Sequence, residues 1–67
     1  MNEDEKTKLK TVVSYWVGHN KEHSQEFREW AEKAKESGES EIYDQISQAA
    51  EDIEKANEAL NRALQRL

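Results

Sequence analysis

Cysteine and proline are absent from this 67-residue sequence, and glycine occurs only twice. Without cysteine the chain forms neither disulfides nor thiolate metal sites, so oligomerisation or a metal held by His and carboxylates must supplement a small core. No apolar stretch approaches the ~18 residues that a membrane span requires. Met1 is followed by Asn-Glu-Asp-Glu-Lys instead of a basic and then an apolar run, so we expect no secretory signal, no membrane association and a cytoplasmic location.

An excess of positive charge is also missing. Ten Lys and Arg residues stand against fifteen Asp and Glu, which gives a net charge of −5. Because the basic residues are scattered among acidic ones, phosphate backbones would be repelled, and we expect no nucleic-acid partner. With 37% charged and 34% hydrophobic residues the chain has the composition of a disordered segment, but the placement of the apolar residues argues against disorder.

The apolar residues follow a heptad-like spacing in both halves of the chain, which is typical of amphipathic helices. In the second half they fall at alternate steps of four and three, at Ile42, Ile46, Ala49, Ile53, Ala56, Leu60, Ala63 and Leu67. The first half repeats this spacing, with two successive steps of four at the histidines, in Leu9, Val12, Trp16, His19, His23, Phe27, Trp30 and Ala34.

Between the two halves lies the turn signal Ser37-Gly38-Glu39-Ser40, where Gly38 suits the left-handed residue that ends a helix and Ser40 suits the N-cap of the next. The sequence therefore predicts an all-α, antiparallel two-helix hairpin. Its arms run over about 9–37 and 40–67, with the turn at 37–40 and an acidic, frayed N-terminus at 1–8. Gly18 leaves two interpretations open, a continuous first arm or a break that gives three helices.

The two heptad rows are expected to face each other and form the core, with large side chains opposite small ones. The predicted core and dimer residues are Trp16, Phe27, Trp30, Ile46, Ile53 and Leu60. A second apolar row flanks the first at Val13, Val17, Ala31, Tyr43, Ala50 and Leu64. Since two helices cannot cover both rows, we expect a homodimer that forms a four-helix bundle.

His19 and His23 are four residues apart, so one helix face carries both imidazoles toward one ion. Neutral imidazole suits divalent nickel, zinc, cobalt and copper. The predicted additional ligands or supporting groups are Asn20, Glu22, Glu26, Glu54 and Asn57. The first hypothesis is therefore a small dimeric metal-binding protein that stores, senses or delivers such an ion. In a symmetric dimer two such pairs could converge.

A second hypothesis is a docking or dimerisation module that presents a helical surface to a larger protein partner. In this interpretation the histidines are structural and bond to Glu54 or Asn57, and no cofactor is bound. The run His19-Asn20-Lys21-Glu22-His23 also matches the H-x-x-E-H signature of a zinc protease class. Such enzymes need a distant third ligand and the cleft of a much larger domain, so we expect a protein that is not an enzyme.

The sequence WVGHNKEHSQEFREWAEKA at 16–34, followed by a glycine turn and AAEDIEKANEAL at 49–60, resembles a small uncharacterised helical-hairpin family of archaea and bacteria. Its signature is W-x-x-H-N-x-E-H-x-x-E-F-x-x-W-A, and the family is loosely associated with nickel and cobalt handling proteins. The resemblance covers 9–67 and implies a metal-linked role for His19 and His23, with Asn20 and Glu22 as companions. Gly18 departs from the helix-forming residue expected in this family.

Overall fold

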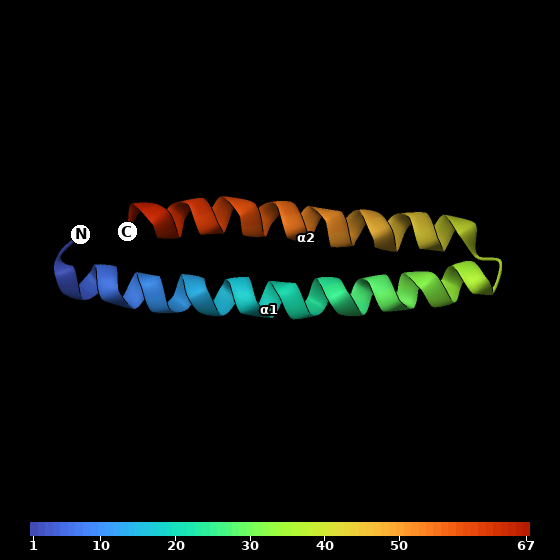
Figure 1. Cartoon of the computed structure of the whole chain (residues 1–67), viewed down its shortest axis with the longest axis horizontal. Helices are drawn as coiled ribbons and strands as arrows, with labels where there is room; N and C mark the ends of the chain where they lie inside the picture. Colours follow the sequence, from blue (N-terminus) through green and yellow to red (C-terminus); the bar gives the residue numbers. More distant parts are fainter.

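The computed structural model describes residues 1–67, and it contains two helices and no strand. Helix α1 runs over Glu3–Glu36 and helix α2 over Ser40–Arg66. They lie side by side in opposite directions, with both termini at one end and the turn at the other (Figure 1). The predicted helical hairpin is confirmed. Neither helix is long and apolar enough to cross a membrane.

The start of α1 differs from the predicted frayed segment, because the first residues carry a complete cap. The side chain of Asn2 accepts a hydrogen bond from the Glu5 backbone N–H at 2.8 Å, and the Glu5 carboxylate accepts one from the Asn2 N–H at 3.2 Å. This capping box satisfies two otherwise unpaired donors. Acidic residues in the first turn also stabilise α1, because their negative charges lie at the positive end of the helix dipole. Helix α1 therefore begins six residues ahead of Leu9.

The turn forms as the glycine predicts. Gly38 has φ +82°, and the N–H groups of Gly38 and Glu39 donate to the carbonyls of Lys35 and Ala34 at 3.0 and 2.9 Å. This pair of bonds is the Schellman arrangement that ends a helix with a left-handed glycine. The cap of α2 differs from the prediction: the N-cap residue is Glu39 without a side-chain bond, and Ser40 is already helical. Helix α1 runs through Gly18 without a break.

The interface between the helices combines part of the predicted core row with the predicted flanking row: Phe27, Ile46, Ile53 and Leu60 come from the first, and Val13, Val17, Ala31, Tyr43, Ala50 and Leu64 from the second. On α1 the buried or half-buried residues that follow the heptad are Val13, Val17, Asn20, Ser24, Phe27, Ala31 and Ala34, and on α2 they are Tyr43, Ile46, Ala50, Ile53, Asn57, Leu60, Leu64 and Leu67. We call these residues the inner row. Its steps alternate four and three on α1 without the irregularity at the histidines, and Asn20 and Ser24 take the places predicted for His19 and His23.

The other two predicted core residues, Trp16 and Trp30, lie at the surface with their neighbour Ile42. Trp16 is 45% exposed, Trp30 62% and Ile42 48%. Each of these residues stands one position before an inner-row residue. In a pair of antiparallel helices, such positions on both helices lie on the same side of the hairpin. The outer face, as we call it, comprises Val12, Trp16, His19, His23 and Trp30 of α1 with Ile42, Ala49, Ala56 and Ala63 of α2. Along its edge lie the half-buried inner-row residues Phe27, Ile46, Ile53 and Leu60.

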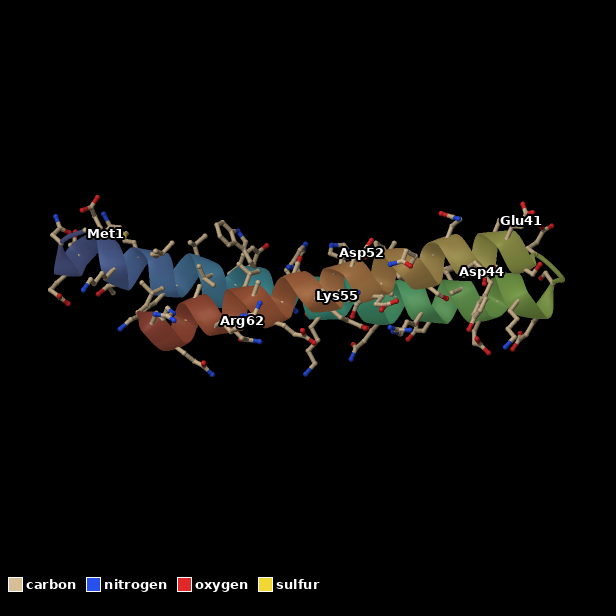
Figure 2. The ribbon with its side chains drawn as sticks, turned by 90° about the horizontal axis from the view of Figure 1, so that it is seen from above. Met1, Glu41, Asp44, Asp52, Lys55 and Arg62 are labelled. Carbon is tan, nitrogen blue, oxygen red and sulfur yellow. The ribbon has the colours of Figure 1, made fainter.

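Small side chains explain why the inner row is preferred between the helices. Ala31 and Ala50 are 1% and 0% exposed, and Ser24 is 5% exposed, and side chains as small as these allow the two helices to pack closely at each position. A tryptophan would not fit there. Figure 2 shows that the helices cross at a shallow angle, as expected for heptad packing, with charged residues such as Asp52, Lys55 and Arg62 along α2.

Candidate metal centre

His19 and His23 lie one turn apart in the middle of α1, on the outer face. Their Nε2 atoms are 2.9 Å apart, and the two rings meet edge to face with centroids separated by 4.5 Å. At this distance one imidazole donates its Nε2–H to the unprotonated Nε2 of the other. The side chain of His23 is 45% exposed, so the pair is within reach of an ion in solution.

Aromatic rings flank the pair along the same helix. Tyr15 stacks on His19 with centroids 5.5 Å apart, and Phe27 lies beside His23 at 6.1 Å. These contacts limit the rotation of both imidazoles, since each ring has a neighbour one turn away. The Nδ1 atom of His23 lies 3.9 Å from a carboxylate oxygen of Glu26, too far for a direct hydrogen bond.

The separation of the two Nε2 atoms is compatible with chelation. Two nitrogen ligands about 2.0–2.1 Å from one ion lie about 2.9 Å apart at a right angle and about 3.3 Å apart at the tetrahedral angle. The observed 2.9 Å equals the first value and falls short of the second by an amount that a small side-chain rotation supplies. For both rings to bind an ion through Nε2, the donor ring would have to carry its proton on Nδ1 instead of Nε2.

Asn20 and Asn57, predicted as additional ligands, bond to each other instead. The amide of Asn20 donates to the Asn57 carbonyl oxygen at 3.0 Å, and the Asn57 amide donates to the backbone carbonyl of Val17 at 3.0 Å. Both side chains belong to the inner row and are partly buried. They fix the register of the two helices, which is the role that a polar residue in a heptad interface commonly has.

Glu54 is also engaged away from the histidines. Arg28 donates to its two carboxylate oxygens at 2.8 and 2.6 Å, a bidentate pair between the helices. The hydrogen bond from Arg28 lowers the pKa of Glu54, and the same bond raises the pKa of Arg28. The interpretation in which the histidines bond to Glu54 or Asn57 has no counterpart among these contacts, and Glu22 is exposed on α1 without a hydrogen bond to either histidine.

A single chain brings together only two candidate ligands. No group of three or more His, Cys, Asp or Glu side chains is arranged to hold a metal ion. Of the predicted supporting groups, only Glu26 approaches the pair. An ion held by His19 and His23 would therefore need further ligands from outside one hairpin.

The sequence interpretation missed the Arg28–Glu54 pair and the buried Ser24. A search for apolar spacing passes over Asn20 and Ser24, although both continue the heptad from Val13 and Val17 to Ala31. That unbroken alternation was the available signal. Nothing in the sequence singles out Arg28 from the other basic residues.

Comparison with known proteins gives one result. The model of a protein family described as "Domain of unknown function (DUF8180)" matches residues 9–67. The match begins at the first residue of the predicted first arm and includes every residue of the candidate site. No curated protein and no solved structure matches the chain.

Proposed function

We propose a metal-binding function for this chain, which belongs to the DUF8180 family. It is a small non-catalytic protein that binds a first-row divalent ion through His19 and His23 and stores, senses or delivers that ion. The observation that supports this proposal is the convergence of the two Nε2 atoms at 2.9 Å on an accessible helix face. Nickel, zinc, cobalt and copper all accept neutral imidazole.

The surroundings of the pair favour reversible binding over catalysis. The two surface hollows, each of about 290 Å³, lie toward the turn and are lined mainly by apolar residues such as Trp30 and Ile46. A catalytic site would need convergent polar groups in a cleft beside the ion. Glu26 lies 3.9 Å from Nδ1 of His23 and would have to move closer to bond and orient that ring, as the partners of ligating histidines do.

Calorimetric titration of the metal-free protein with nickel, zinc, cobalt and copper tests the proposal. We expect at least one ion to bind more tightly than about 100 μM, which corresponds to roughly −5.5 kcal/mol. Affinity should fall on acidification, because protons compete with the ion for the imidazole nitrogens. Failure of all four ions to reach that affinity would remove the metal function.

The double variant His19→Gln/His23→Leu supplies the control. Metal binding should disappear, while the hairpin should retain its stability, since neither histidine bonds to the inner row. In the parent, a metal ion at 100 times its Kd should add about 2.7 kcal/mol to the free energy of unfolding. In the variant, the same ion should leave the free energy of unfolding unchanged. A metal-induced rise in melting temperature that persists in the variant would place the ion elsewhere.

A docking or dimerisation module is the second candidate, favoured by the exposed tryptophans. Trp16 and Trp30 stand on a continuous apolar surface, and such surfaces commonly mark an interaction site. Under this alternative the protein associates, with itself or with a larger partner, and added metal leaves its melting temperature unchanged. The titration above separates the two functions.

A further inference from the structure

The hairpin exposes more surface than its size accounts for. A monomeric protein of 7.8 kDa exposes about 4,400 Å² by the usual dependence on mass, whereas this chain exposes 5231 Å². The excess, about 830 Å², is close to the ~800 Å² that each partner buries in a standard protein interface. The radius of gyration is likewise 15.6 Å, against roughly 11 Å for a compact domain of this length.

The outer face is the region that a partner would cover. Its apolar residues extend along both helices, and near the turn Phe27, Trp30, Ile46 and Ala49 line one continuous hollow. That hollow, about 290 Å³, is at the lower end of small-molecule sites and better suited to a side chain from another protein.

The arrangement of alanines on α2 identifies the partner. The exposed or half-exposed alanines of the outer face are Ala49, Ala56 and Ala63, so Ala56 stands midway between the other two. A twofold axis through Ala56, perpendicular to the helices, would place each alanine of one α2 helix against an alanine of a second α2 helix. Alanines at such positions let two helices pack closely.

The histidines lead to the same axis independently. Lys21 is midway between His19 and His23, and the Asn20–Asn57 hydrogen bond sets a register in which Ala56 lies at the level of Lys21. An axis at that level brings His19 of one copy to the level of His23 of the other. The same operation brings Tyr15 of the second copy to the level of Phe27, beside the hollow.

From these observations we infer that a second copy of this chain covers the outer face in an antiparallel twofold arrangement, α1 on α1 and α2 on α2, and completes the metal site with its own two imidazoles. This inference rests on the proposed metal function. One ion then takes four Nε2 ligands, two from each chain, which fills the positions that a single hairpin leaves open. The interface forms without metal, because apolar residues stand on both sides of the histidines along the outer face, and metal strengthens it by linking the two copies.

Single cysteine variants test the arrangement directly, because the chain has no other thiol. In Ala56→Cys the two sulfurs should meet at the axis, within the ~7 Å between Cα atoms that a disulfide tolerates. Ala63→Cys is the matched control on the same face: its two copies lie about 21 Å apart, at 1.5 Å per residue from the axis, and should not crosslink. Both variants are oxidised with glutathione in the absence of metal, and the fraction of covalent dimer is measured. Most of the Ala56→Cys chains and few of the Ala63→Cys chains should be crosslinked.

Stoichiometry and mass complete the test. Sedimentation of the metal-free parent at tens of micromolar should give twice 7.8 kDa, and titration should saturate at one ion per two chains. A monomer, a dimer in which Ala56→Cys does not crosslink, or saturation at one ion per chain would each overturn the inference. The last result would leave the proposed metal function intact. Crosslinking of Ala56→Cys without any metal binding would keep the dimer but refute both the shared site and the metal function.

Discussion

The Asn20–Asn57 contact offers the sharpest test of the inner row. Replacing Asn57 by alanine removes two partly buried hydrogen bonds, one from the Asn20 amide and one to the Val17 carbonyl, both 3.0 Å long. At about 1 kcal/mol net for each bond, the free energy of unfolding should fall by about 2 kcal/mol. For a domain of this size that corresponds to a drop of roughly 8–16 °C in melting temperature.

Asn61→Ala is the matched control for this prediction. Asn61 is on the same helix, exposed and without a hydrogen bond, so its replacement brings the same gain in helix propensity without the loss of a contact. Thermal melts followed by circular dichroism should be compared at one protein concentration, because association shifts the midpoint. The difference between the two variants then reports the two bonds alone.

A double-mutant cycle locates the effect. Asn20→Ala removes one of the two bonds, and once it is made, Asn57→Ala should cost less than it does in the parent, with a coupling of about 1 kcal/mol. If Asn57→Ala were as stable as Asn61→Ala, or if the two asparagines showed no coupling, the inner row described here would not be the helix interface.

Three further predictions address the turn, the closest packing and the interhelical ion pair. Gly18→Ala should raise the free energy of unfolding by about 1 kcal/mol, because Gly18 lies within a regular helix and an added Cβ meets nothing within 4 Å. Gly38→Ala should lower the free energy of unfolding by about 1 kcal/mol, since φ is +82° at Gly38. Chemical denaturation of both variants checks that the two effects have opposite signs. Ala50→Leu should destabilise by about 1–3 kcal/mol through overpacking at a fully buried position, and a melt equal to the parent's would contradict the close approach of the helices. Arg28 lowers the pKa of Glu54 in the folded state, so the pair stabilises the fold above the ordinary carboxyl pKa and this contribution is lost as the pH falls through the lowered value. The difference in free energy of unfolding between the parent and Glu54→Gln should therefore shrink below about pH 4.5. Arg28→Gln should abolish that pH dependence, and an unchanged acid profile in Arg28→Gln would assign it to another group.

The two helices and their turn could be predicted because local signals determine them. Gly38 is the residue that tolerates a positive φ, and heptad spacing on both sides of it requires two amphipathic helices of matching length. The start of α1 was missed because a capping box at Asn2 and Glu5 lies outside the apolar pattern on which the prediction depended.

The choice of interface could not be read from apolar spacing alone. Two adjacent rows on each helix satisfy the same periodicity, and the row with larger hydrophobic residues was assigned to the core. Between only two helices, however, small residues such as Ala31 and Ala50 allow close packing, which Trp16 and Trp30 would prevent. The same choice decides the site: the histidines lie on the outer face, while Asn57, expected beside them, pairs with Asn20 in the inner row.

The Schellman turn at Gly38 also bears on how quickly the hairpin forms. The bond from the Glu39 N–H to the Ala34 carbonyl closes a segment of five residues, whereas the Asn20–Asn57 bond closes a segment of 37. Forming the Asn20–Asn57 bond before the turn would therefore cost roughly 2 kcal/mol more in loop entropy than forming the turn first. Helix pairing should therefore nucleate at the turn and proceed toward the termini. Substitutions beside Gly38 would then change mainly the rate of folding, and those near the chain ends mainly the rate of unfolding.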